Sequence, residues 1–282
     1  MDPAGSGPPT VSVVIPSFQN VDTIVATVET VLGQTFPDLE LVISDHSSTD
    51  GTWEALQRFS ADPRVRLRRQ PAGGGAPANW NAVTDAARGE FVKLVCGDDL
   101  LTPTAVAEQV AALRAHPEAV LAAARRDIVD DRGRVLIAGR GLQGLRAGLV
   151  PGRAVIAGTV RAGTNILGEP ACVLFRRSAL AAAGGWDGSW PYLIDEATYC
   201  AVLEQGPAVA IDRTLAAFRV SAGQWSVRLA RQQARTVRDF HRTVAGRHRL
   251  ARGEVLLGNL RATAAAAGRR LIYLALRWRR RS

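Results

Sequence analysis

Two adjacent carboxylates, Asp98 and Asp99, follow the mainly apolar run of residues 91–95 after Cys96 and Gly97. Withdrawing such charges from water is costly unless water, a partner or a metal ion compensates them. Mg²⁺ and Mn²⁺ prefer oxygen ligands of this kind and usually share them with substrate phosphates. In the other interpretation, one aspartate caps the helix predicted to begin near Pro103 and the other is solvated. The pair alone leaves a cation site and a capping role open.

Apolar segments that precede such polar groups alternate with segments of helical periodicity. The predicted strands are residues 11–16, 39–44, 65–69 and 91–95, and the predicted helices between them are residues 20–34, 53–59 and 77–87. This alternation indicates an α/β fold with a mostly parallel central sheet covered by helices on both faces. Ligands bind beyond the carboxyl ends of strands in such sheets, so residues 16–18, Asp45 and Asp98 should converge on one crevice.

The second half of the chain continues this pattern less regularly. Predicted strands at 120–124 and 171–175 accompany predicted helices at 103–115, 177–183 and 195–205. Between them, residues 130–168 are rich in Gly and Arg, which predicts a hairpin followed by a mobile loop. Beyond residue 226, apolar residues recur at helical spacing among arginines, which predicts amphipathic helices.

Composition excludes several classes of protein. With 282 residues, of which 47% are hydrophobic and 22% charged, the chain can bury a core. No apolar run approaches the roughly 20 residues of a membrane-spanning helix, and no secretory signal precedes the first strand, so we expect a cytoplasmic protein. Three widely spaced cysteines argue against a disulfide framework or a zinc site. We predict a disordered tail (1–10), one large domain (11–225) and a basic helical extension (226–282).

The net charge of +9 is distributed unevenly. Residues 1–225 carry 20 basic and 24 acidic side chains, whereas residues 226–282 carry 15 arginines and two acids. An arginine-rich amphipathic helix with Trp278 near its end suits an anionic membrane surface, which would place the protein on the cytoplasmic face of the membrane. A helical face packed on the body or on a second subunit is the alternative. Nucleic acid is not expected as a partner, because the body is acidic and carries no nucleic-acid-binding motif.

Several short strings in a fixed order give a more specific indication. They are Pro16-Ser17-Phe18, residues 31–45, residues 48–52, Asn79-Trp80-Asn81, residues 87–92, residues 97–101, Gly168-Glu169-Pro170, and residues 184–187 followed by Asp195. In order and spacing they closely resemble the family 2 glycosyltransferases of the GT-A fold, over residues 11–220. The resemblance implies a Rossmann-like GT-A fold, with residues 11–225 as the catalytic domain and residues 226–282 as an extension.

The same resemblance implies a nucleotide-sugar donor, which could be a UDP-, GDP- or dTDP-sugar. The residues that it assigns to donor binding are Pro16, Ser17, Phe18, Asp45, Asn81 and Asp98. A buried carboxylate at Asp45 that accepts the imino N–H of a pyrimidine is physically reasonable, since an unmet acceptor costs about 1–3 kcal/mol. His46 stands where the family often has an acid or Asn, which leaves the base open. A simple turn residue is the alternative for His46.

The family's metal motif, Asp-x-Asp, is altered in this sequence. Cys96 occupies the first acidic position, so the motif is Cys-Gly-Asp-Asp. A thiol is a poor ligand for Mg²⁺ or Mn²⁺, so Asp98 together with Asp99 is predicted to hold the cation and Cys96 to be structural. The cation would neutralise the departing nucleoside diphosphate.

The resemblance also implies inversion at the anomeric carbon by single displacement, which requires a general base. Asp195 lies at the expected distance after Gly184-Gly185-Trp186 and is the predicted base, with Glu196 as the second candidate. An ordinary helix cap is the alternative for Asp195. Trp186 and Trp190 could stack on a sugar, although a core position is equally open for Trp186. The predicted acceptor is a hydroxyl group of a glycan or a lipid-linked sugar.

Two other classes of function stay open at this stage. Cys96, His46 and Trp80 depart from the family pattern, so a catalytically degenerate GT-A domain that binds glycans or scaffolds a membrane complex is one alternative. A nucleotidyltransferase is the other, although it lacks support because Gly73-Gly74-Gly75 is not followed by the Lys of a phosphate loop.

Overall fold

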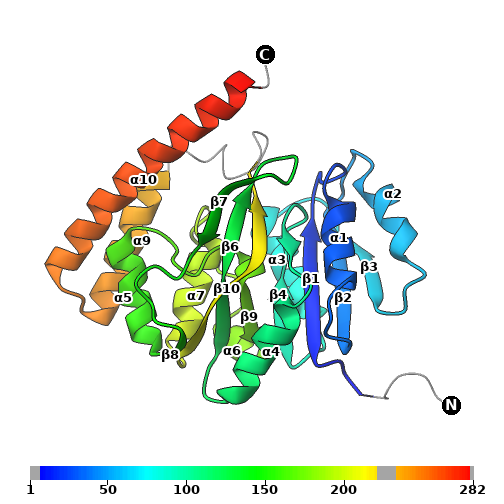
Figure 1. Cartoon of the computed structure of the whole chain (residues 1–282), viewed down its shortest axis with the longest axis horizontal. Coiled ribbons are helices and arrows are strands. Elements are labelled where there is room, and N and C mark those ends of the chain that lie inside the picture. The colour runs from blue at the N-terminus through cyan, green and yellow to red at the C-terminus, as the bar shows by residue number, and fades with distance from the viewer. Residues whose placement is uncertain (1–6, 221–232, 280–282) are drawn as a thin grey trace.

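The computed structural model describes residues 7–220 and 233–279, and within these the side chains of residues 7–220 and 235–265. The described part folds around one ten-stranded sheet with helices on both faces (Figure 1). The strands are β1 (Val11–Ser17), β2 (Leu39–Asp45), β3 (Val65–Arg69), β4 (Phe91–Leu94), β5 (Leu100–Leu101), β6 (Leu121–Val129), β7 (Val135–Arg140), β8 (Gly148–Val150), β9 (Val173–Arg176) and β10 (Ala208–Arg219). The tail predicted at residues 1–10 lies mainly outside the described residues.

The helices alternate with these strands. They are α1 (Ile24–Leu32), α2 (Thr52–Leu56), η1 (Gln57–Phe59), α3 (Gly75–Asp85), α4 (Ala105–Ala115), α5 (Gly152–Ala162), η2 (Pro170–Cys172), α6 (Arg177–Ala182), α7 (Ile194–Leu203), α9 (Gln233–His248) and α10 (Arg252–Arg279). In α1 the apolar residues Ile24, Val28 and Val31 are fully buried, which is the single face that helical spacing predicts.

The sheet begins with four parallel strands in the order β3-β2-β1-β4. Every residue of β1, β2 and β4 is buried, as is typical of parallel strands covered on both faces. The register brings Ser17 beside Asp45 at the ends of β1 and β2. The carboxyl ends of these strands therefore lie together, and the predicted α/β fold with a mostly parallel sheet is confirmed.

The other half of the sheet combines parallel and antiparallel pairs. Strand β9 runs antiparallel between β4 and β6, and β10 pairs with β6 in parallel over most of its length. Short antiparallel strands β5 and β8 lie against β10, and β7 forms a hairpin with β6.

Residues 130–168 differ from the prediction of a hairpin followed by a mobile loop. The hairpin is present, but strand β8 and the eleven-residue helix α5 follow it. Val155, Ile156 and Val160 are fully buried and form one face of this helix. The Gly and Arg residues that favour a loop lie on its outer face and at its ends, where Gly163 closes α5 with a φ of +69°. Strand β10 was also not predicted.

Helices α9 and α10 belong to the basic extension. Val237, Phe240, His241, Val244 and Ala245 of α9 are buried, at the spacing of an amphipathic helix. Helix α9 packs on α5, and α10 packs on α5 and α9, while its C-terminal end projects away from the sheet (Figure 1). The side chains of residues 266–282 lie outside the described residues, so the membrane contact predicted for them stays a prediction. No helix in the described ranges is long and apolar enough to span a membrane.

Candidate active site

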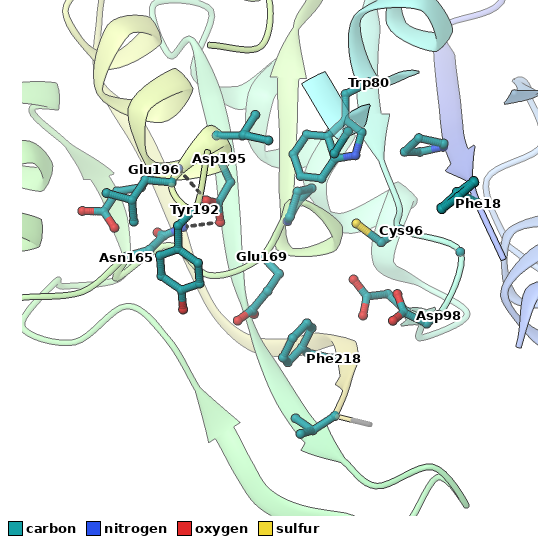
Figure 2. A pocket seen from close by; sticks show the side chains of 18 of the residues that line it. Phe18, Trp80, Cys96, Asp98, Asn165, Glu169, Tyr192, Asp195, Glu196 and Phe218 are labelled. Carbon is teal, nitrogen blue, oxygen red and sulfur yellow. Dashed lines mark hydrogen bonds between the residues drawn. The ribbon is translucent and has the colours of Figure 1, made fainter. Parts of the chain in front are cut away.

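A cleft of about 1010 Å³ opens at the carboxyl ends of β1, β2 and β4 and extends to the start of α7. Figure 2 shows Phe18 and Asp98 toward one end, Asp195 and Asn165 toward the other, and Glu169 between them. The topology thus brings Pro16, Phe18, Asp98, Asp99 and Asp195 of the predicted site residues to one cavity, as the convergence of strand ends favours.

One end of the cleft is formed by residues that follow β1 and β2. Pro16, Phe18 and His46 line it. The Phe18 ring is 56% exposed and meets the buried His46 ring edge to face, with centroids 6.1 Å apart. His46 is therefore a wall of the cleft, although its sequence position is equally compatible with a turn. A flat, exposed aromatic ring beside a cleft is suited to stacking against a planar ligand.

Asp45 and Asn79 provide unfilled acceptors beside this end. Asp45 is fully buried; its Oδ2 accepts the Ser48 N–H at 3.1 Å and lies 3.4 Å from Arg69 Nε. Asn79 lines the cleft and donates from Nδ2 to the Ser17 carbonyl. Asp45 Oδ1 and Asn79 Oδ1 are buried without a hydrogen-bond partner among the described residues. Buried acceptors of this kind fit a ligand that carries N–H donors.

Asp98 and Asp99 line the cleft directly after β4. The Asp99 side chain is fully buried; Oδ1 accepts the Arg219 N–H, and Oδ2 has no hydrogen-bond partner in the described part of the chain. Burial raises the pKa of the Asp99 carboxyl well above its usual range, and the neighbouring Asp98 and Glu169 carboxylates raise it further. The pair does not cap α4, because no side chain caps that helix at its N-cap, Thr104.

These two carboxylates fit a divalent cation. Asp99 Oδ2 is buried without a hydrogen-bond partner among the described residues and lies close to the negative charge of Asp98. A bound cation stabilises such a pair of carboxylates. Within residues 7–220 and 233–279, no three His, Cys, Asp or Glu side chains are grouped as a complete metal cage. That is compatible with Mg²⁺ or Mn²⁺, which commonly take one or two carboxylates and complete their shell with substrate phosphates and water.

Cys96 lies between the carboxylates of the cleft. Burial raises the pKa of its thiol well above the usual range, and the charges of Asp99, Asp98 and Asp195 act in the same direction. The thiol is therefore neutral at physiological pH in the absence of a cation. The structural role expected of Cys96 stays a prediction.

Asp195 lies in the first turn of α7, with its carboxylate on the cleft (Figure 2). Asn165 Nδ2 donates to Oδ2 at 2.8 Å, and the Glu196 N–H donates to Oδ1 at 2.8 Å. Burial, together with the charges of Glu196 and Glu169, raises the pKa of Asp195 to about 7, while the two hydrogen bonds oppose this shift. Such a carboxyl changes its protonation state near neutral pH, as a general base requires.

Two polar residues of the cleft were not predicted. Glu169 lies between Asp98 and Asp195 and forms an ion pair with the buried Arg126, with Nε and Oε2 2.6 Å apart. Its string, Gly168-Glu169-Pro170, carries the family resemblance, which was the available signal. Asn165 orients Asp195 but lies in the segment predicted as a loop, where no motif marks it.

The structure does not bring Ser17, Asp45 and Asn81 to the cleft lining, and Asp45 is fully buried behind it. The Ser17 side chain is fully buried, and its carbonyl holds Asn79. Asn81 Nδ2 donates to the carbonyls of Pro77 and Trp186, and its Oδ1 accepts the Trp186 N–H. A Cβ at Gly185 would lie 2.5 Å from that Oδ1, so Asn81 and Gly185 together fix the turn before α7.

The two tryptophans considered for sugar stacking are also placed elsewhere. Trp186 is buried and packs edge to face on Trp80 and Phe175. Trp190 packs on Phe240 of α9, with ring centroids 5.3 Å apart. Trp80 does line the cleft, and Tyr192 lines it beside Asp195.

Together, the mostly parallel sheet covered by helices on both faces and the acidic cleft at the strand ends define a GT-A type transferase domain. The family model "Glycosyl transferase family 2" matches residues 12–182, and the chain belongs to that family. It is 32% identical over 100 residues to the Escherichia coli UDP-Glc:alpha-D-GlcNAc-diphosphoundecaprenol beta-1,3-glucosyltransferase WfaP. This match covers 36% of the present chain and 39% of the relative, so the chain matches about two fifths of that curated protein's length.

Solved structures share the fold. The S. aureus TarS 1-349 complex with UDP-GlcNAc has a TM-score of 0.67 at 18% identity, and the match covers 84% of this chain and 65% of TarS 1-349. The Pyrobaculum calidifontis mannosyltransferase PcManGT, in complex with GDP-Man and Mn²⁺, has a TM-score of 0.62 at 18% identity, covering 93% and 76% of the two chains. The predicted GT-A fold and family 2 resemblance are confirmed.

Proposed function

We propose that this chain is an inverting glycosyltransferase that moves a sugar from a nucleotide-sugar donor to a hydroxyl group of a glycan or lipid-linked acceptor. The observation that carries the proposal is one cleft with a carboxylate pair, Asp98 and Asp99, at one end and Asp195 at the other. Family membership supports the reaction class. A UDP-GlcNAc complex and a GDP-Man complex among similar structures support a nucleotide-sugar donor.

The donor nucleotide is proposed to lie at the end formed by Pro16, Phe18 and His46. The exposed Phe18 ring offers a stacking surface for the base, and the unfilled oxygens of Asp45 and Asn79 offer acceptors for N–H groups. Leaving such a buried acceptor unmet costs about 1–3 kcal/mol, so a ligand that fills it gains that much selectivity. UDP, GDP and dTDP each carry a base with suitable N–H donors.

The diphosphate of the donor would then extend toward Asp98 and Asp99. These two carboxylates would hold Mn²⁺ or Mg²⁺ together with the diphosphate oxygens. When bound, the cation supplies electrostatic stabilisation to the negative charge that develops on the leaving diphosphate. Cys96 presents a neutral thiol to this charge and does not add a further negative group.

Asp195 is proposed as the general base. Asn165 fixes one carboxylate oxygen and orients the group toward the cleft. Asp195 takes the proton of the acceptor hydroxyl while the acceptor oxygen forms its bond to the anomeric carbon and the bond from that carbon to the diphosphate oxygen breaks. Attack from the face opposite the leaving group inverts the anomeric configuration. The apolar side chains of Phe218, Val220 and Val237 on the cleft would limit access of water, which competes as an acceptor.

The basic extension is proposed to bring the enzyme to an anionic membrane surface on its cytoplasmic side. Residues 266–282 contain six arginines and no acid, and the ribbon of α10 carries this segment away from the body (Figure 1). Each arginine near an anionic surface contributes about 1 kcal/mol of attraction. A lipid-linked acceptor would reach the cleft from such a surface.

Two substitutions test the catalytic proposal in the full chain. Asp98→Asn and Asp195→Asn should each abolish transfer from a nucleotide sugar in the presence of Mn²⁺, while thermal unfolding shows that both variants fold. A screen of nucleotide sugars by thermal shift identifies the donor beforehand, because a ligand that binds the native state stabilises it.

The same experiment separates this proposal from a catalytically degenerate domain. A degenerate domain would bind a nucleotide sugar without transferring or hydrolysing it. Mn²⁺-dependent hydrolysis in the wild type that disappears in Asp98→Asn supports the enzyme, and full activity in both variants would refute the assigned roles.

A further inference from the structure

Helix α9 reaches the start of α7 through a buried contact between His241 and Glu196. His241 Nε2 lies 2.5 Å from Glu196 Oε1, and the two side chains are 1% and 3% exposed. Nδ1 of His241 is buried without a hydrogen-bond partner among the described residues, so Glu196 is the polar group that holds the ring. A polar contact this deep is costly to break, because the partner left behind stays buried.

Glu196 is in turn joined to Asp195. The Glu196 backbone N–H donates to Asp195 Oδ1, while Asn165 holds Oδ2. The Glu196 carboxylate also acts through its charge, since it is the largest contributor after burial to the raised pKa of Asp195. A movement or neutralisation of Glu196 therefore changes both the position and the proton affinity of Asp195.

Other ionisable groups face this position from several elements. They are Glu196 and Tyr199 of α7, Cys96 after β4, Glu169 before η2 with its partner Arg126 of β6, and His241 of α9. Arg126 is paired with Glu169, and the Cys96 thiol is neutral. His241 is thus the residue of the extension that acts on the Asp195 environment through a direct polar contact.

We propose that His241 is a positioning residue: by holding the Glu196 carboxylate it fixes the first turn of α7 and so places Asp195 for proton transfer. The proposal rests on the role of Asp195 proposed above. It assigns a catalytic purpose to α9, which lies outside the region matched by the family model. Val237, one turn earlier on α9, lines the cleft itself, so the helix contributes to the site at two points.

The same two helices provide a matched control. His248 of α9 lies 3.1 Å from Glu204, which is the C-cap of α7. This second His–Glu contact is half-exposed, at 15% and 35%, and lies at the end of α7 that is remote from the cleft. Its loss should disturb the packing of α9 on α7 without touching Asp195.

The first test compares His241→Met with His248→Met in the full chain. We expect His241→Met to lower kcat by at least about tenfold, because small displacements of a catalytic group have effects of that size, and to leave the KM for the donor unchanged. His241→Gln retains an N–H donor and should recover most of the loss. Equal kcat values in His241→Met and His248→Met would overturn the proposal.

The second test uses the pH profile of kcat/KM, which packing alone does not move. Glu196→Gln removes a negative neighbour of Asp195, so the acid limb should shift to lower pH, whereas Glu204→Gln should leave it in place. An unshifted limb in Glu196→Gln overturns the proposal. So does a loss of transfer as complete as in Asp195→Asn, because Glu196 would then itself be the base.

Glu196→Gln and Glu204→Gln keep the test decisive if His241→Met fails to fold. A wild type that transfers no sugar from any nucleotide-sugar donor refutes the proposed function. An active wild type in which the two histidine variants behave alike refutes only the role of His241.

Discussion

At the scale of single residues, the protonation state of the proposed base Asp195 should set the pH at which transfer occurs. Burial, followed by the Glu196 charge, raises the pKa of this carboxyl to about 7. The proton-accepting form is the carboxylate, which is the major species only above that pH. Transfer should therefore rise with pH through the neutral range and not near pH 4, where an ordinary aspartate titrates.

A pH series of kcat/KM for the acceptor checks this expectation. At pH values below the pKa of Asp195, kcat/KM should fall about tenfold per pH unit, as expected when one group must lose a proton before it can act. A profile that is flat from pH 5 to pH 8 would contradict Asp195 as the base.

Cys96 allows a second prediction at this scale. Because a neutral thiol is a poor ligand for Mn²⁺, Cys96→Ser should change transfer by no more than about twofold. Cys96→Asp should instead add a third carboxylate beside Asp98 and Asp99 and lower the Mn²⁺ concentration that gives half-maximal activity. Titrating activity with Mn²⁺ in the three proteins decides the matter. A large increase in the Mn²⁺ requirement of Cys96→Ser would make the thiol a ligand after all.

At the scale of secondary-structure elements, α10 and α5 meet at two glycines. A Cβ at Gly258 would lie 1.9 Å from the Val160 carbonyl oxygen, and a Cβ at Gly163 would lie 2.3 Å from the Gly258 carbonyl oxygen. Residues 163–165 line the cleft, and Asn165 holds Asp195. The docking of α10 therefore supports the loop that orients the proposed base.

Gly258→Ala should separate the two helices. We expect it to destabilise the fold by about 1–3 kcal/mol, as overpacking does, and to lower kcat through the loop of residues 163–165. Gly253→Ala, in the same helix, is the control, because nothing lies within 4 Å of its Cβ position. Because that glycine lies in the first turn of α10, its replacement should stabilise the helix by less than about 1 kcal/mol. Thermal unfolding measures both changes, and a neutral Gly258→Ala would contradict the close approach.

The elements also explain how much of the site could be predicted from the sequence. Pro16, Asp45 and Asp98 lie at or shortly after the carboxyl ends of β1, β2 and β4, which are neighbours in the parallel part of the sheet, so their proximity follows from topology once the strands are recognised. Asn165 and His241 come from segments whose position depends on tertiary packing. The glycines and arginines of residues 130–168 conceal the short apolar face of α5, and of the two histidines among fifteen arginines nothing in the sequence shows that His241 is the buried one.

At the scale of the whole molecule, the two ends of α10 should have separate roles. Residues 252–265 include side chains that pack on α5, such as the buried Ala262, whereas residues 266–282 carry six arginines without an acid. Removal of residues 266–282 should abolish binding to vesicles that contain anionic lipid, while transfer to a soluble acceptor continues.

Vesicle co-sedimentation with neutral and anionic lipids measures this effect, and raised salt should weaken binding of the full chain. Undiminished binding of the shortened chain to anionic vesicles would remove the membrane role from this segment. Impaired transfer to a soluble acceptor would show that the segment also supports the site.

The order of the strands has a further consequence for how such enzymes diversify. The proposed donor-binding residues lie between positions 16 and 99, in one uninterrupted stretch of chain, whereas the proposed base Asp195 and the two residues that hold its surroundings, Asn165 and His241, come later in the sequence. A single crossover near residue 100 would thus exchange the acceptor half and keep the donor half intact. Recombination at that point offers a route to enzymes that use the same nucleotide-sugar donor and form new glycosidic linkages to other acceptors.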